Sequence, residues 1–101
     1  MATTSKTLFR GAATTSTGTT LYTVPSATTA VVTSIVVTNT AGSAGTFTLG
    51  MGGTNFATQV TVGAYDSTVI DTKQVLTATQ TITGGASATD INFHISGVEI
   101  A

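Results

Sequence analysis

The sequence contains no cysteine, which excludes disulfide bonds, thiolate metal ligands and cysteine nucleophiles. Charge is also scarce: 7% of the 101 residues are charged, against about 25% in a typical domain, and the net charge is −1. The basic residues are Lys6, Arg10 and Lys73, spread along the chain. Because nucleic-acid binding requires several cations that displace phosphate counterions, we expect no nucleic-acid partner.

Long apolar runs are missing as well. No run approaches the roughly 20 residues of a membrane span, so we expect no membrane partner. Residues 1–10 carry two basic side chains but lack the apolar stretch of a signal peptide, which predicts a soluble protein made in a cytoplasm without a cleaved leader. A mean hydropathy of +0.39 with nearly balanced charge favours a folded chain over a disordered one.

Groups that could perform chemistry are few. His94 is the one histidine, and Asp90 lies on the same face of its strand about 13 Å away, beyond hydrogen-bond reach. Asp66 and Asp71 are close in sequence, but their odd spacing turns them to opposite faces of a strand. No calcium-binding loop and no phosphate-binding glycine loop is present. We therefore predict no enzyme activity, no cofactor and no metal site, and interpret His94 as a surface or subunit-contact residue.

Threonine is what the sequence has in abundance, at about a quarter of all residues. Threonine is β-branched and fits the pleated surface of a strand better than a helix. Alternating apolar and polar residues, bounded by Gly, Pro, Asn and Ser, divide the chain into about eight short strands. We predict an all-β fold, a single antiparallel β-sandwich of the jelly-roll kind over residues 1–101, with residues 1–5 as a flexible N-terminal arm.

The predicted strands cover residues 7–13, 21–24, 29–38, 46–51, 58–62, 66–76, 79–83 and 91–100, with hairpin turns at 39–45 and 52–55 and a loop at 84–89. In the last strand Ile91 and Ile95 share one face, whereas after Gly97 the apolar residues are Val98 and Ile100. This change of parity predicts a β-bulge at Gly97, where glycine accepts the dihedral angles of an inserted residue.

The strand over residues 29–38 is apolar on both faces. Alternation places Val31, Ile35 and Val37 on one side and Val32 and Val36 on the other. A strand of this kind needs cover on both sides. Two interpretations stay open: a loop of the same chain covers Val32 and Val36, or these two valines face another subunit.

Three segments carry a resemblance to a known class of proteins. LYTVPSATTAVVTSIVVTNT (residues 21–40), TFTL (46–49) and INFHISGVEI (91–100) resemble small virion proteins of tailed phages. The resemblance implies a β-sandwich or jelly roll that decorates capsids as trimers or forms part of tails and fibres. The small size favours a capsid decoration, or cement, protein on the capsid surface, whose partners are copies of itself and the major capsid protein.

The scarcity of charge agrees with this expectation. Open sheet edges with few lysines and prolines, and apolar outer patches, are covered in natural proteins by assembly. The candidate interface residues are Val32, Val36, Phe9 and Arg10. The alternatives are a tail or tail-fibre component of the virion, and a carbohydrate-binding module that uses Tyr65 and Asn55.

Overall fold

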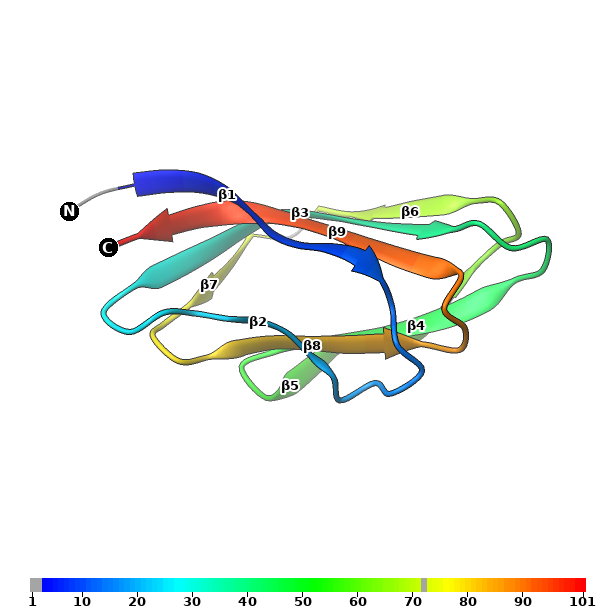
Figure 1. Ribbon diagram of the computed structural model, residues 1–101, viewed down its shortest axis with the longest axis horizontal. Coiled ribbons are helices and arrows are strands. Elements are labelled where there is room, and N and C mark those ends of the chain that lie inside the picture. Colours follow the sequence, from blue (N-terminus) through cyan, green and yellow to red (C-terminus); the bar gives the residue numbers. More distant parts are fainter. Residues whose placement is uncertain (1–2, 72) are drawn as a thin grey trace.

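The computed structural model describes residues 3–71 and 73–101, and the regular elements in this part of the chain are strands. They are β1 (Thr3–Ala12), β2 (Thr20–Thr23), β3 (Thr29–Asn39), β4 (Gly45–Met51), β5 (Thr54–Val62), β6 (Ser67–Ile70), β7 (Gln74–Leu76), β8 (Thr81–Ala86) and β9 (Ile91–Ile100). Figure 1 shows two layers. One is a five-stranded sheet of order β1, β9, β3, β6, with β7 also paired to β3, and the other is a four-stranded sheet of order β2, β8, β4, β5.

The strand pairs describe one long hairpin that is rolled into two layers. All pairs are antiparallel. The hairpin is formed by β1 with β9, β2 with β8, β3 with β6 and β7, and β4 with β5, while the pairs of β3 with β9 and of β4 with β8 join its turns within each sheet. The hairpin turns at Gly52 and Gly53, whose positive φ angles of 59° and 86° suit the tight turns that match strand twist. Because β6 and β7 follow each other along the same edge of β3, nine strands fill the eight positions of a jelly roll. The predicted fold class is confirmed.

The core lies between the two layers and is built from alternating residues of both inner faces. Phe47 of β4 and Phe93 of β9 are almost fully buried and meet edge to face, with ring centroids 6.1 Å apart. An edge-to-face contact of this kind places the positive ring edge against the negative ring face. Around this pair lie the other large buried side chains: Val24, Val32, Ile35, Val37, Leu49, Val62, Ile82, Ile91 and Ile95.

The prediction of a bulge at Gly97 is wrong, because the bulges lie in the two strands beside Gly97 and not in β9 itself. β9 keeps its alternation through Gly97, which is buried on the inner face, and the inserted residues are Leu8 in β1 and Thr33 in β3. A Cβ atom on Gly97 would lie 2.5 Å from the carbonyl oxygen of Val31 and 2.8 Å from Leu8 Cδ1. Glycine is therefore required here because two bulged neighbours crowd the strand, while the strand itself stays regular.

Other predicted boundaries also change. The single strand predicted over 66–76 is two strands, β6 and β7, and β5 begins at Thr54, four residues earlier than predicted. The loop predicted over 84–89 is shorter, because residues 84–86 complete β8.

The N-terminal arm also differs from the expectation. Thr3, Thr4 and Ser5 form the start of β1 and pair with β9, and residues 1–2 lie outside the described residues. Within the described residues, no helix has the length and apolar character needed to cross a membrane.

Candidate functional site

The outer face of the five-stranded sheet carries exposed valines in two cross-strand rows. One row runs through Ser5, Val98, Val31 and Val75, and the other through Arg10, His94, Val36 and Val69. Val69 and Val75 are 66% and 62% exposed. Val31, Val36 and Val98 are half-buried. We call the surface formed by Val31, Val36, Val69, Val75 and Val98 the valine face.

The chemistry of the valine face suits a protein contact. Directly opposed residues of an antiparallel pair lie about 5 Å apart, so the valines of each row touch and form continuous apolar surface. Valine is stiff at χ1 and therefore loses little side-chain entropy when it packs against a partner. Arg10, at the sheet edge, is the one charged residue in these two rows, so little charge must be desolvated.

The structure brings two of the predicted interface residues together. Arg10 and Val36 flank His94 in the same row, all three on the outer face. Val32 is fully buried in the core, so the prediction that it faces another subunit is wrong. The inserted Thr33 shifts the alternation of β3, so that Val31 takes the outer position and Val32 the inner one.

Phe9, the fourth predicted interface residue, lies elsewhere. It is partly buried at the edge of the five-stranded sheet and packs against the core. Its ring also lies beside Gly11, where a Cβ atom would be 3.7 Å from Phe9 Cζ. Phe9 therefore contributes to the sandwich interior and not to the valine face.

Sequence reasoning missed Val69 and Val75, the two most exposed members of the valine face. Each is an isolated valine in a short segment, STVI for β6 and QVL for β7. The available signal was that both segments can pair with one strand, β3, whose outer face already carries Val31 and Val36. Pairing places Val69 beside Val36 and Val75 beside Val31.

The acidic side chains are dispersed. Asp66 Oδ1 accepts a hydrogen bond from Ser67 N at 2.8 Å, and Asp71 forms an exposed ion pair of 3.1 Å with Lys73. Among the residues that the structure describes, no three of the His, Cys, Asp and Glu side chains gather in a way that could hold a metal ion. His94 lies on the outer face, opposite Arg10 of β1 and Val36 of β3.

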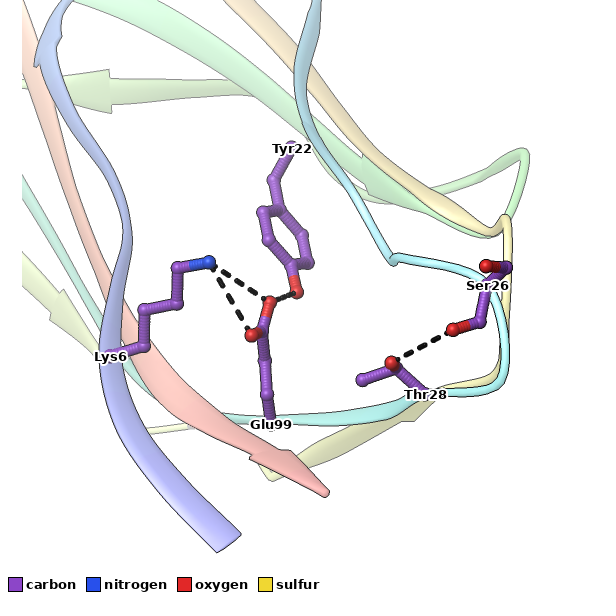
Figure 2. A network of polar contacts seen from close by, with 5 residues as sticks. All are labelled: Lys6, Tyr22, Ser26, Thr28 and Glu99. Carbon is purple, nitrogen blue, oxygen red and sulfur yellow. Dashed lines mark hydrogen bonds and ion pairs between the residues drawn. The ribbon is translucent and has the colours of Figure 1, made fainter. Parts of the chain in front are cut away.

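Lys6, Tyr22 and Glu99 form a polar network at one end of the sandwich, shown in Figure 2. The Tyr22 hydroxyl donates to Glu99 Oε2, and Lys6 Nζ lies 3.3 Å from the same carboxylate oxygen. The hydrogen bond from Tyr22 lowers the pKa of Glu99, partial burial opposes this, and Lys6 lowers it further. Burial raises the pKa of Tyr22 well above its usual value, and the bond to Glu99 raises it more. The network joins β1 and β9 to β2 of the other sheet.

Asn39 organises the loops at the opposite end of β3. Its buried side-chain amide donates to Ser43 O at 2.8 Å and to the carbonyl oxygens of Val62 and Gly63 at 3.3 Å. Asn39 Oδ1 accepts from Ala41 N at 2.9 Å. One buried side chain therefore ties the loop after β3 to the loop after β5.

Tyr65 lies in that second loop and is 77% exposed, with a left-handed φ of 53°. Asn55 lies near the start of β5 and Tyr65 beyond its end. The strand between them is roughly 20 Å long. Tyr65 and Asn55, the residues named for the carbohydrate-binding alternative, therefore lie at opposite ends of β5 and not side by side.

Comparison with known proteins places the fold. No protein-family model and no curated protein sequence matches this chain. A chain of the acidic-stable capsid structure of Helicobacter pylori bacteriophage KHP30 is similar with a TM-score of 0.51 and 11% identity, covering 99% of this chain and 94% of that chain. A chain of the extra small virus VLP of the giant freshwater prawn Macrobrachium rosenbergii gives a TM-score of 0.49 and 15% identity, covering 100% of this chain and 81% of that chain. The first likeness shows a shared fold over nearly the full length of both chains.

Proposed function

We propose that this chain is a virion structural protein that decorates a capsid surface as a trimer. The observation that carries the proposal is the valine face: a nearly charge-free sheet surface with two valines more than 60% exposed. Exposed apolar side chains that gather on one face mark contact sites in soluble proteins, and here Ser34 and Ser96 separate the two rows. In a trimer with cyclic symmetry, each copy presents the valine face to its neighbours.

The fold supports the same proposal. Jelly rolls are frequent in viral capsid proteins. The similar chain that spans almost the same length belongs to the capsid structure of a phage. Neither observation depends on the valine face, so the surface chemistry and the fold support the proposal independently.

The contact to the capsid protein is assigned to the edge of the five-stranded sheet. Arg10 is exposed on edge strand β1, on the outer face, whereas Lys6 of the same strand is held by Glu99. A cation at the rim of an apolar patch favours an acidic partner and fixes orientation more than it adds affinity. Many identical weak contacts over a capsid sum to tight attachment.

The test is co-sedimentation with capsids assembled without this protein. The wild-type chain should sediment with the capsids and raise their resistance to heat. The double variant Val36→Asp/Val69→Asp should lose both effects, because a charge at either position of the valine face must be desolvated on contact. Thr61→Asp, on an exposed position of the other sheet, is the matched control and should behave as wild type.

Two results would count against the proposal. Binding to purified tails and not to capsids would assign the chain to the tail or tail fibre. Absence of binding to any virion part would reject a virion role.

A further inference from the structure

The outer face of the four-stranded sheet is hollowed, in contrast to the valine face. A hollow of about 340 Å³ lies between the loop after β1 and strands β4 and β5. Its polar rim is formed by the hydroxyl and amide side chains of Thr15, Thr17, Thr46, Asn55, Thr58 and Gln59. None of the described residues that line the hollow is charged.

Two glycines shape the hollow. A Cβ atom on Gly85 would lie 2.2 Å from Ser16 O, so glycine lets the loop after β1 rest directly on β8. The loop is fixed there by hydrogen bonds from Gly84 N to Thr19 O and from Ala86 N to Thr14 O. These contacts raise one wall of the hollow above the sheet.

On the opposite side, a Cβ atom on Gly50 would lie 2.6 Å from Asn55 Oδ1, so glycine there makes room for the Asn55 amide. The Asn55 side chain therefore reaches over Gly50 of β4. It forms part of the hollow's rim on the β5 side.

A bulge in β5 supplies the other wall. Thr58 and Gln59 together oppose the single residue Thr48, and Gln59 N donates to Thr48 Oγ1 at 3.1 Å. Gln59 has a left-handed φ of 50°. The other non-glycine residues with positive φ, Ala27, Tyr65 and Thr79, lie in turns, whereas Gln59 lies within a strand.

The left-handed conformation of Gln59 has a consequence for function. It costs a non-glycine residue roughly 1–2 kcal/mol, and such strain concentrates at ligand sites. Bulges likewise redirect side chains next to binding sites. Here the bulge turns two polar side chains toward the hollow where a regular strand would turn one.

We propose that this hollow binds a neutral saccharide. Hydroxyl and amide side chains both donate and accept hydrogen bonds, as sugar hydroxyl groups do. Among the described residues, no hydrogen bond within the protein engages the side chains of Thr15, Thr17, Asn55, Thr58 or Gln59. A lining without charge does not complement phosphate, sulfate or carboxylate groups.

A peptide strand fits this place less well than a saccharide. Strand addition needs an even edge of main-chain donors and acceptors. The register of β5 is interrupted twice, between its partners Phe47 and Leu49 and between Leu49 and Gly50. The interrupted edge therefore disfavours pairing with an incoming strand.

The test is an array of neutral oligosaccharides of hexoses and N-acetylhexosamines, with sialylated and sulfated glycans alongside. The full-length chain should bind neutral glycans, and titration calorimetry with a bound oligosaccharide should give its affinity in solution. Gln59→Gly suits the left-handed backbone and should keep or raise the melting temperature, while weakening the binding about tenfold through the lost amide. Asn55→Ala should weaken it similarly, and Tyr65→Ala, outside the hollow, should leave it unchanged.

Several outcomes would overturn the assignment. The assignment fails if the array shows no neutral glycan bound, or if the chain prefers charged glycans. It fails also if Gln59→Gly and Asn55→Ala both bind as wild type does, or if the hollow binds a peptide and no saccharide. The proposal is independent of the virion role, because Val36→Asp/Val69→Asp should retain solution binding of the oligosaccharide. If this double variant loses capsid attachment but still binds the saccharide, the virion role and the saccharide site are separate properties of the chain.

Discussion

The hydroxyl group of Tyr22 donates a hydrogen bond to the carboxylate of Glu99, which joins β2 of one sheet to β9 of the other. Glu99 continues the inward alternation of β9, so its side chain points toward the opposite layer. Lys6 of β1 also belongs to this network, with its Nζ atom 3.3 Å from Glu99 Oε2. A jelly roll with no disulfide thus has a polar connection between its layers at the end where β1 begins and β9 ends.

Removing this connection should cost stability. Tyr22→Phe keeps the buried ring and deletes the hydroxyl, leaving Glu99 paired with Lys6 alone among the side chains of this network. We expect a loss of about 1–2 kcal/mol in the free energy of unfolding, as is usual for a hydrogen bond to a charged group. Urea denaturation measures the loss, and Tyr65→Phe, at an exposed hydroxyl, is the matched control. Equal stability of the two variants would mean that the bond contributes nothing.

The same network predicts that the free energy of unfolding depends on pH in the acidic range. The pKa of Glu99 is lowered in the folded state, chiefly by Tyr22, so its contribution to stability is present above the usual glutamate value of about 4.3 and is lost as the pH falls below it. Glu99→Gln has no such contribution to lose. The stability advantage of wild type over Glu99→Gln should therefore shrink between pH 7 and pH 3, measured by urea denaturation. A constant difference across this range would contradict the assigned role.

The bulge at Thr33 can be tested by comparing adjacent valines. Val32 is fully buried and Val31 is half-buried on the outer face. Val32→Asp places an unpaired charge in the core and should abolish or severely weaken folding, by several kcal/mol. Val31→Asp should remain folded, with a loss on the order of 1 kcal/mol. Circular dichroism during heating distinguishes them, and the reverse order of stability would show that the alternation of β3 is not shifted.

Gly97 should tolerate no side chain. Gly97→Ala puts a methyl group against the carbonyl oxygen of Val31, and overpacking of this kind costs typically about 1–3 kcal/mol. Gly18→Ala is the matched control, because a Cβ atom there meets nothing within 4 Å. Chemical denaturation should show a clear loss for the first variant and almost none for the second. Similar midpoints would mean that the neighbouring bulges can move away.

The sequence pattern predicted the jelly roll because alternation and turn residues are local signals. Phe47 and Leu49 in β4, and Ile91, Phe93 and Ile95 in β9, face the core as their spacing indicated. The turn at Gly52 and Gly53 was equally readable, because glycine pairs favour the backbone of tight hairpins.

The candidate site was predicted only in part, because the sequence of one strand does not show where its partner strands force a bulge. The insertions at Leu8 and Thr33 arise where three strands meet, and they change the face of every residue beyond them. Counting from Ile35 therefore placed Val32 outside and Val31 inside. In β9, the same crowding was misread as an irregularity of Gly97 itself.

The most direct test of the account is the mass of the purified chain in solution, measured by sedimentation velocity over a range of concentrations. We expect the wild-type chain to sediment as a trimer, and Val36→Asp/Val69→Asp to sediment as a monomer with an unchanged circular dichroism spectrum. Thr61→Asp should remain trimeric. A wild-type chain that stays monomeric at every concentration, or a double variant that assembles as well as wild type, would contradict the claim that the valine face joins copies of this protein.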